Sequence, residues 1–347
     1  MTNPVVESAI AENPKDARSR VTRDALRYLA LAYIFAWTSW LLVIKTNIGE
    51  EYLNVGVAGP AIAAMILSRN HSVEASATHR SPRWVWFMLL TVLCWLVLSA
   101  HYQWRAADRI TLYLNPLTLI PSVFPAWVLS SVLSRDCGVR SLVGRLVHRP
   151  TPWSLSSLIC WPIFLLVPGA IAYAFRLPLV WPQHSGTPGV IAARATAFFL
   201  YNILFVGVEE EPGWRGFLLD RLQLRFSPLL ASVLVWLPWS LWHGPLDYYR
   251  PVRFNLAMWF LIRVAMAIPI NILLVWFYNR SRRSIQATAL FHAGMNTFPF
   301  VLPYCQPAYT LVFLWAGYAV VSGKMWRSPR EPSENVTGAY PCANVQS

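Results

Sequence analysis

The sequence predicts an all-α fold, a polytopic bundle of transmembrane helices with roughly 8–10 spans. Of the 347 residues, 56% are hydrophobic and 13% are charged, and the mean hydropathy is +0.41. An average soluble domain is about a quarter charged, so this chain has too little charge for a surface that faces water. The apolar residues also form long blocks, such as 84–100 and 257–278, each near the ~20 residues that cross a bilayer.

Two other fold classes are excluded by the patterning. A water-soluble helical protein needs shorter apolar stripes with a charged opposite face, and residues 85–99 and 259–274 have no such face. A transmembrane β-barrel needs a strict alternation of apolar and polar residues, which these blocks lack. Membrane lipid is therefore the expected surrounding of the chain.

Apolar blocks bounded by breakers define the individual spans, roughly ten in number. Proline supports several boundaries, and Pro116, Pro121 and Pro125 predict a kinked or interrupted fourth helix. The expected spans are residues 28–44, 55–67, 84–100, 110–133, 155–175, 190–208, 228–242, 257–278, 285–302 and 308–321.

The placement of the basic residues predicts the topology. The chain has 29 Lys and Arg residues and a formal net charge of +13. Most of these residues lie on alternate connections between the apolar blocks, which is the positive-inside pattern. We therefore expect an even number of crossings, both termini in the cytoplasm, and a multi-pass protein of a bacterial plasma membrane. A nucleic-acid partner is not expected, because the charge follows the connections and forms no single basic face.

Three consecutive carboxylates, Glu209, Glu210 and Glu211, follow an apolar helix at membrane depth. Each buried charge there costs at least ~2.5 kcal/mol, so a partner is required. On a helix, Glu211 and Arg215 lie one turn apart and can pair, while Glu210 is rotated by ~100° and left for other work. The cluster could also mark no more than a cytoplasmic helix end.

Two later histidines favour chemistry. His243 ends an apolar stretch one turn after Trp239, and His292 stands one turn before Asn296 within another apolar stretch. A lone helix histidine is more often structural, but a glutamate, two histidines and an asparagine on three separate helices combine acceptors, donors and titratable groups. Intramembrane ionisable residues usually face the bundle interior and pair with one another.

These motifs resemble those of the CPBP family of intramembrane proteases, which includes the type II CAAX endopeptidases. The motifs are Glu-Glu-x-x-x-Arg, aromatic-x-x-x-His and His-x-x-x-Asn, in that order. One departure is Trp239, where many members have Phe, and we expect it to affect packing. The residues of this chain that form the three motifs are Glu210, Glu211, Arg215, Trp239, His243, His292 and Asn296.

The resemblance implies an intramembrane endopeptidase that cuts a peptide bond near the cytoplasmic leaflet. Glu210 would activate water with the aid of His243, while His292 and Asn296 would hold the oxyanion, since neutral imidazole and carboxamide supply hydrogen-bond donors. Glu211, Arg215 and Trp239 would support the site. The substrate would be a peptide or protein, with a lipidated substrate as one option.

The resemblance also suggests a division of the chain. Residues 1–26 would form a cytoplasmic tail, 27–188 the N-terminal transmembrane helices, 189–303 the catalytic helices, 304–327 a final transmembrane helix and 328–347 a C-terminal tail. For Glu210 to reach His243, the glutamate helix must continue past Arg215, with residues 217–226 forming its last turns or an elbow.

Alternatives stay open at this point. No cofactor is expected, but Glu210, His243 and His292 would be the ligands if the protein were a zinc protease; the spacing is not that of His-Glu-x-x-His. The chain could also be a non-catalytic membrane partner or immunity-type protein, or a transporter. Elsewhere, Arg263 is expected near the end of its span, and Asn271 is expected to bridge helices.

Overall fold

The computed structural model describes residues 14–69, 82–104, 112–182, 186–249, 259–305 and 308–327. Within these ranges the chain forms helices and no β-strand, with one isolated antiparallel bridge between Val180 and Tyr304. The prediction of an all-α helical bundle is confirmed. Of the expected N-terminal tail, residues 14–26 form the start of a helix, and residues 1–13 lie outside the described part, as does the whole expected C-terminal tail, residues 328–347.

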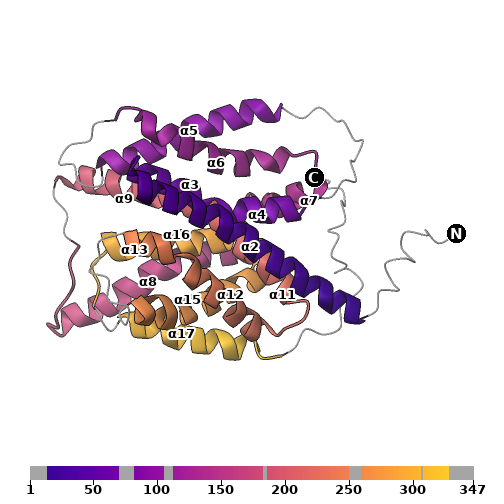
Figure 1. Cartoon of the computed structure of the whole chain (residues 1–347). Helices are drawn as coiled ribbons and strands as arrows, with labels where there is room; N and C mark the ends of the chain where they lie inside the picture. The colour runs from indigo at the N-terminus through magenta and orange to yellow at the C-terminus, as the bar shows by residue number, and fades with distance from the viewer. Residues whose placement is uncertain are drawn as a thin grey trace.

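The first half of the chain contributes three long helices and several short ones. In Figure 1, α2 crosses the bundle diagonally and α5 lies beside α6. The elements are α2 (Pro14–Thr46), η1 (Glu50–Tyr52), α3 (Leu53–Val57), α4 (Gly59–Leu67), α5 (Arg83–Trp104), η2 (Pro116–Thr118), α6 (Leu119–Ser130), η3 (Ser131–Leu133), α7 (Cys137–Gly144) and α8 (Pro152–Ala174).

The second half contains the helices that carry the predicted site. Its first five elements join into one helix of 35 residues, Pro188–Leu222. The elements are α9 (Pro188–Asn202), η4 (Ile203–Gly207), α10 (Val208–Gly213), η5 (Trp214–Leu219), α11 (Asp220–Leu222), α12 (Pro228–Trp242), α13 (Gly244–Tyr249), η6 (Phe260–Met266), α15 (Ala267–Arg280), α16 (Ile285–Val301) and α17 (Ala308–Ser322).

Among the described residues, six helices are long and apolar enough to cross a membrane: Ser19–Thr46, Arg83–Trp104, Pro116–Leu133, Pro152–Ala174, Pro188–Leu222 and Pro228–Tyr249. The sequence predicted more because several apolar blocks form shorter helices. The expected second span contains α4, whose nine residues are too few to cross the bilayer, and α16 has 17 residues. The expected eighth span begins within residues 250–258, which lie outside the described part.

Two π-helical segments, η4 and η5, flank the short α-helix α10 that carries the three glutamates. Pro212 stands inside α10 and lacks the N–H that a regular α-helix would use. The wider turns on either side keep the chain helical through this position. Such π turns within α-helices are frequent at functional sites.

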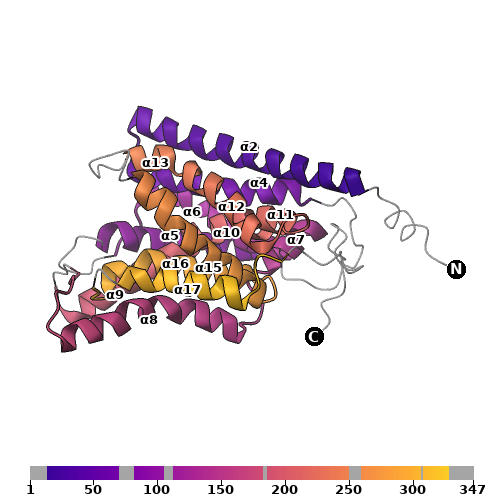
Figure 2. The ribbon, with the colours of Figure 1, turned by 90° about the horizontal axis from the view of Figure 1, so that it is seen from below.

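Small residues let this helix approach its neighbours closely. A Cβ atom on Gly207 would lie 2.9 Å from Cβ of Ala289 in α16, and one on Gly213 would lie 2.5 Å from the carbonyl oxygen of Pro60 in α4. Both glycines therefore permit contacts that a side chain would block. Figure 2 shows α2 along one edge of the bundle and α8 along the opposite edge, with α10, α12, α15 and α16 between them.

Caps define where two site helices begin. Ser227 accepts a hydrogen bond from the backbone N–H of Leu230, and Pro228 occupies the first turn of α12. Ser284 accepts a hydrogen bond from the backbone N–H of Ala287 at the start of α16. These caps satisfy backbone donors that a helix end leaves unpaired, so the register of the helices carrying His243 and His292 is set locally.

Candidate active site

The three glutamates of α10 are buried. The relative exposures of Glu209, Glu210 and Glu211 are 0%, 3% and 0%. The helix continues through η5 to Leu222 in α11, as the geometry of the predicted site required. The cluster therefore lies in the interior of the helix bundle, and the interpretation of it as a mere helix end is wrong.

Glu211 pairs with Arg215, as the spacing predicted. Arg215 Nη1 donates to Glu211 Oε1 at 2.9 Å, and both side chains are fully buried. Arg215 Nη2 also donates to Asn271 Oδ1 at 2.6 Å. Asn271 in turn donates through Nδ2 to the carbonyl of Ser232. This chain of contacts joins the glutamate helix to α15 and α12, and Asn271 bridges helices as expected.

Glu210 points to a different partner. The indole Nε1 of Trp239 on α12 donates to Glu210 Oε2 at 2.9 Å, and the contact is buried. The expectation that Trp239 would only alter packing is therefore incomplete. Phenylalanine, which many CPBP proteins have here, carries no N–H and could not make this bond.

His243 also contacts Trp239, but through the main chain. Its Nδ1 lies 2.8 Å from the carbonyl oxygen of Trp239. Because a carbonyl oxygen can only accept, this contact places the proton on Nδ1. In the neutral ring, Nε2 then carries a lone pair and can accept a proton from another group.

His292 turns toward the ion pair. Its Nδ1 lies 2.8 Å from Glu211 Oε1, the oxygen that Arg215 also contacts. If His292 is neutral with its proton on Nδ1, its Nε2 can only accept a hydrogen bond. Nε2 becomes a donor only when the ring carries both protons, as an imidazolium. This differs from the expectation of a neutral imidazole donor. Asn296, one turn later on α16, is half-buried, and its amide has no hydrogen-bond partner within the described ranges.

The indole of Trp239 lies at the centre of these groups. Its ring centroid is 5.6 Å from that of His243 and 5.5 Å from that of His292, with edge-on geometry in both cases. The guanidinium carbon of Arg215 lies 4.8 Å from the Trp239 ring centroid. Contacts from α10, α12 and α16 therefore converge on this one side chain, as the sequence constellation implied.

A cavity of about 430 Å³ opens beside Trp239 and His243. Apolar side chains supply much of its wall, including Trp161, Ile270 and Met295. An apolar cavity with a few convergent polar groups is the usual form of a ligand site. A peptide or an apolar substituent in this cavity would lie beside His243 and beside Trp239, whose indole contacts Glu210.

Arg263 lies in the same cavity wall and pairs with an acid that the sequence analysis did not single out. Arg263 Nε and Nη2 donate to the two oxygens of Asp247, each at 2.6 Å. Asp247 follows His243 by one helical turn, and this spacing could have identified Asp247 from the sequence as a residue near the site. The bidentate pair balances the charge of Arg263 beside the cavity.

Glu209 is unlike its neighbours. Both of its carboxylate oxygens are buried and without a hydrogen-bond partner in the described part of the chain. Burial removes such a carboxylate from water, and no hydrogen bond offsets the free-energy cost of that desolvation. Glu209 therefore takes no part in the network of Glu210 and Glu211, which makes it a natural control position.

The zinc alternative finds no support in this arrangement. Within the described ranges, no group of three or more His, Cys, Asp and Glu side chains is placed to hold a metal ion. His243 Nδ1 faces a backbone carbonyl and His292 Nδ1 faces Glu211, so the ligand set Glu210, His243 and His292 is not assembled through these atoms.

Comparison with known proteins agrees with the motifs. The family model described as type II CAAX prenyl endopeptidase, Rce1-like, matches residues 192–298. CAAX prenyl protease 2 of Methanococcus maripaludis is 28% identical over 190 residues, which cover 52% of this chain and 70% of that protein. The resemblance drawn from the sequence is confirmed. The matched segment contains Glu210, Trp239, His243, His292 and Asn296.

Proposed function

We propose that this chain, a membrane protease whose residues 192–298 match the model of the Rce1-like type II CAAX prenyl endopeptidases, hydrolyses a peptide bond near the cytoplasmic leaflet, with Glu210 as the general base. The observation that carries the proposal is the hydrogen bond of 2.9 Å from Trp239 to Glu210 Oε2. This contact fixes one oxygen of a buried carboxylate and leaves Oε1 to take a proton.

The first step activates water. A water molecule held between Glu210 Oε1 and His243 Nε2 gives up a proton while its oxygen attacks the carbonyl carbon of the substrate. The C=O bond becomes a C–O⁻ single bond in the tetrahedral intermediate. The proton then passes to the leaving nitrogen as the C–N bond breaks, which yields an amine and a carboxylic acid, and the acid gives its proton to solvent or to the amine.

Charge on the intermediate is held on the opposite side by α16. His292, whose Nδ1 contacts Glu211, donates through Nε2 when the ring carries both protons, and the amide of Asn296 supplies a second donor. Glu211 supports this role because its Oε1 lies 2.8 Å from Nδ1 and holds the orientation of the ring. Preorganised donors of this kind contribute strongly to acyl-transfer reactions.

The apolar cavity supports a lipidated substrate. Its wall of Trp161, Ile270 and Met295 would accommodate a hydrocarbon substituent beside His243. The similar protein of Methanococcus maripaludis is named CAAX prenyl protease 2. We extend that substrate class to this chain: a peptide ending in prenyl-cysteine and three further residues.

The test is hydrolysis by the purified full chain in lipid nanodiscs. Mass spectrometry of the released C-terminal fragment, for the prenylated peptide and for its unprenylated twin, measures both activity and selectivity. We expect cleavage after the cysteine with a strong preference for the prenylated form. Equal cleavage of both peptides would show that the enzyme does not recognise the prenyl group, and would refute that part of the proposal. No cleavage of either, nor of a broad peptide library, would favour a non-catalytic membrane partner.

A further inference from the structure

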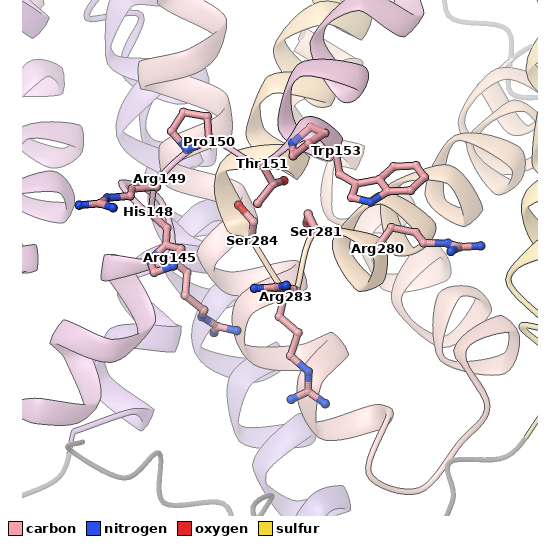
Figure 3. A pocket seen from close by; sticks show the side chains of 12 residues that line it. Arg145, His148, Arg149, Pro150, Thr151, Trp153, Arg280, Ser281, Arg283 and Ser284 are labelled. Carbon is pink, nitrogen blue, oxygen red and sulfur yellow. The ribbon is translucent and has the colours of Figure 1, made fainter. Parts of the chain in front are cut away.

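A second hollow, of about 600 Å³, lies apart from the candidate active site, where the α7–α8 connection meets the α15–α16 connection (Figure 3). Its lining comes from two segments more than a hundred residues apart in the sequence, between residues 145 and 153 and between 280 and 284. We call this the basic pocket. It is bounded by the first turns of α8 and α16 and by the last turn of α15.

The lining of the basic pocket includes five arginines and no acidic residue. Arg145 is balanced from outside the lining, because its Nη1 lies 2.8 Å from Asp220 Oδ2. Arg283 lies 3.6 Å from the same carboxylate. Arg149 and Arg282 are exposed and have no ion-pair or hydrogen-bond partner among the residues that the structure describes. The pocket thus has uncompensated positive charge, which an anion would balance.

Hydroxyl groups complete the lining. Figure 3 shows Thr151, Ser281 and Ser284 at the middle of the basic pocket. It also shows Arg145, Arg280 and Arg283 around them. Guanidinium groups match the geometry of phosphate oxygens, and hydroxyls add hydrogen-bond donors. This chemistry suits a phosphate group.

The flanking residues place the basic pocket at the depth of lipid headgroups. Arg280 lies 5.5 Å from the ring centroid of Trp153 and 5.8 Å from that of Trp276, and tryptophan concentrates at membrane interfaces. Leu155, one turn beyond the pocket residue Thr151, begins a series of exposed apolar side chains on α8 that continues with Ile159 and Ile163. A lipid with its phosphate in the pocket would have its acyl chains beside that helix.

We infer that the basic pocket binds the phosphate of an anionic phospholipid. The inference is independent of the proposed hydrolysis, because it rests on the convergence of the two basic segments and on their position at the end of the lipid-facing side of α8. The basic connections also belong to the side that the positive-inside pattern assigns to the cytoplasm. One wall reaches the catalytic helix, since Arg145 Nη2 donates to the carbonyl of Gly216 at 2.7 Å.

The test uses native mass spectrometry of the purified full chain with equal amounts of phosphatidylglycerol and phosphatidylcholine. The variant Arg149→Gln/Arg282→Gln removes two charges that have no partner in the fold, so folding should be retained. The matched control Arg69→Gln/Arg327→Gln removes two exposed charges from other connections on the same predicted side. A basic residue near an anionic surface contributes about fivefold to affinity, so the pocket variant should bind phosphatidylglycerol about 25-fold more weakly.

A second arm separates the lipid from a soluble phosphate. Millimolar glycerol 3-phosphate is added to the chain in phosphatidylcholine nanodiscs, and the thermal unfolding midpoint is measured. If glycerol 3-phosphate raises the unfolding midpoint of the wild type but not of the pocket variant, the pocket recognises phosphate and also accepts a soluble phosphate compound. No rise, together with selective phosphatidylglycerol retention, would support the lipid alone. Equal retention of the two lipids by the wild type, or a preference that Arg149→Gln/Arg282→Gln leaves intact, would overturn the inference.

Discussion

Trp239 contacts both Glu210, the proposed general base, and His243, which would assist it. Its indole N–H donates to Glu210 Oε2 at 2.9 Å, and its carbonyl oxygen lies 2.8 Å from Nδ1 of His243. One residue of α12 therefore sets the orientation of a carboxylate on α10 and the tautomer of the histidine one turn later. Catalytic groups act only when held close to their productive geometry, so Trp239 would be a positioning residue in the proposed reaction.

Trp239→Phe should lower kcat while leaving the fold intact. The substitution keeps an aromatic ring and removes the N–H that holds Glu210. A hydrogen bond to a charged group is worth roughly 1.5–3 kcal/mol, so we expect kcat to fall by roughly tenfold to a hundredfold, with a smaller change in KM. Steady-state kinetics on the cleaved peptide measure the two parameters separately.

Trp236→Phe is the matched control. Trp236 lies on the same helix, and its Nε1 is buried without a hydrogen-bond partner among the described residues. Its replacement removes the same atoms and breaks no such bond. If Trp236→Phe reduced kcat as much as Trp239→Phe, the loss would reflect helix packing and the positioning role would be refuted.

Glu211→Gln should reduce folded yield more than it changes any single kinetic constant. The substitution leaves the fully buried Arg215 without its counter-ion, and breaking a buried pair in this way costs about 3–5 kcal/mol. The yield of monodisperse protein on size-exclusion chromatography reports the effect. Glu211→Gln/Arg215→Met should recover part of the yield, because it strands no charge. If Glu211→Gln alone were as stable as the wild type, the ion pair would be dispensable for folding.

Ile270→Trp should block the cavity beside His243. The larger side chain would occupy space that the substrate needs, and we expect kcat/KM to fall by roughly tenfold or more. Leu237→Trp makes a similar change at an exposed position of α12 and should leave kcat/KM unchanged. Unaltered kinetics in Ile270→Trp would place the substrate elsewhere.

The sequence carried enough information to predict the membrane class and the Glu211–Arg215 pair, because both depend on local pattern. Hydrophobic blocks of membrane length need no tertiary context, and a one-turn spacing on a helix brings two side chains together wherever the helix lies. The bridging role of Asn271 followed similarly, since a buried amide in a span needs partners on neighbouring helices.

Other features depend on tertiary contacts. The hydrogen bond from Trp239 to Glu210 joins helices that are 29 residues apart in the chain, so no local pattern revealed it. The Asp247–Arg263 pair is likewise formed across the interhelical connection. An apolar block such as residues 55–67 can be buried by protein and need not cross lipid, as α4 shows. Such blocks explain part of the difference between the expected spans and the six long apolar helices of the described residues.

The most direct test of the account compares Glu210→Gln with Glu209→Gln in nanodiscs. Both changes replace a buried carboxylate by an amide at adjacent positions of α10, but only Glu210 contacts Trp239. We predict that Glu210→Gln lowers kcat by about a hundredfold to ten-thousandfold at normal folded yield, while Glu209→Gln stays close to the wild type. Full activity in Glu210→Gln, or loss of activity only in Glu209→Gln, would contradict the assignment of Glu210 as the base.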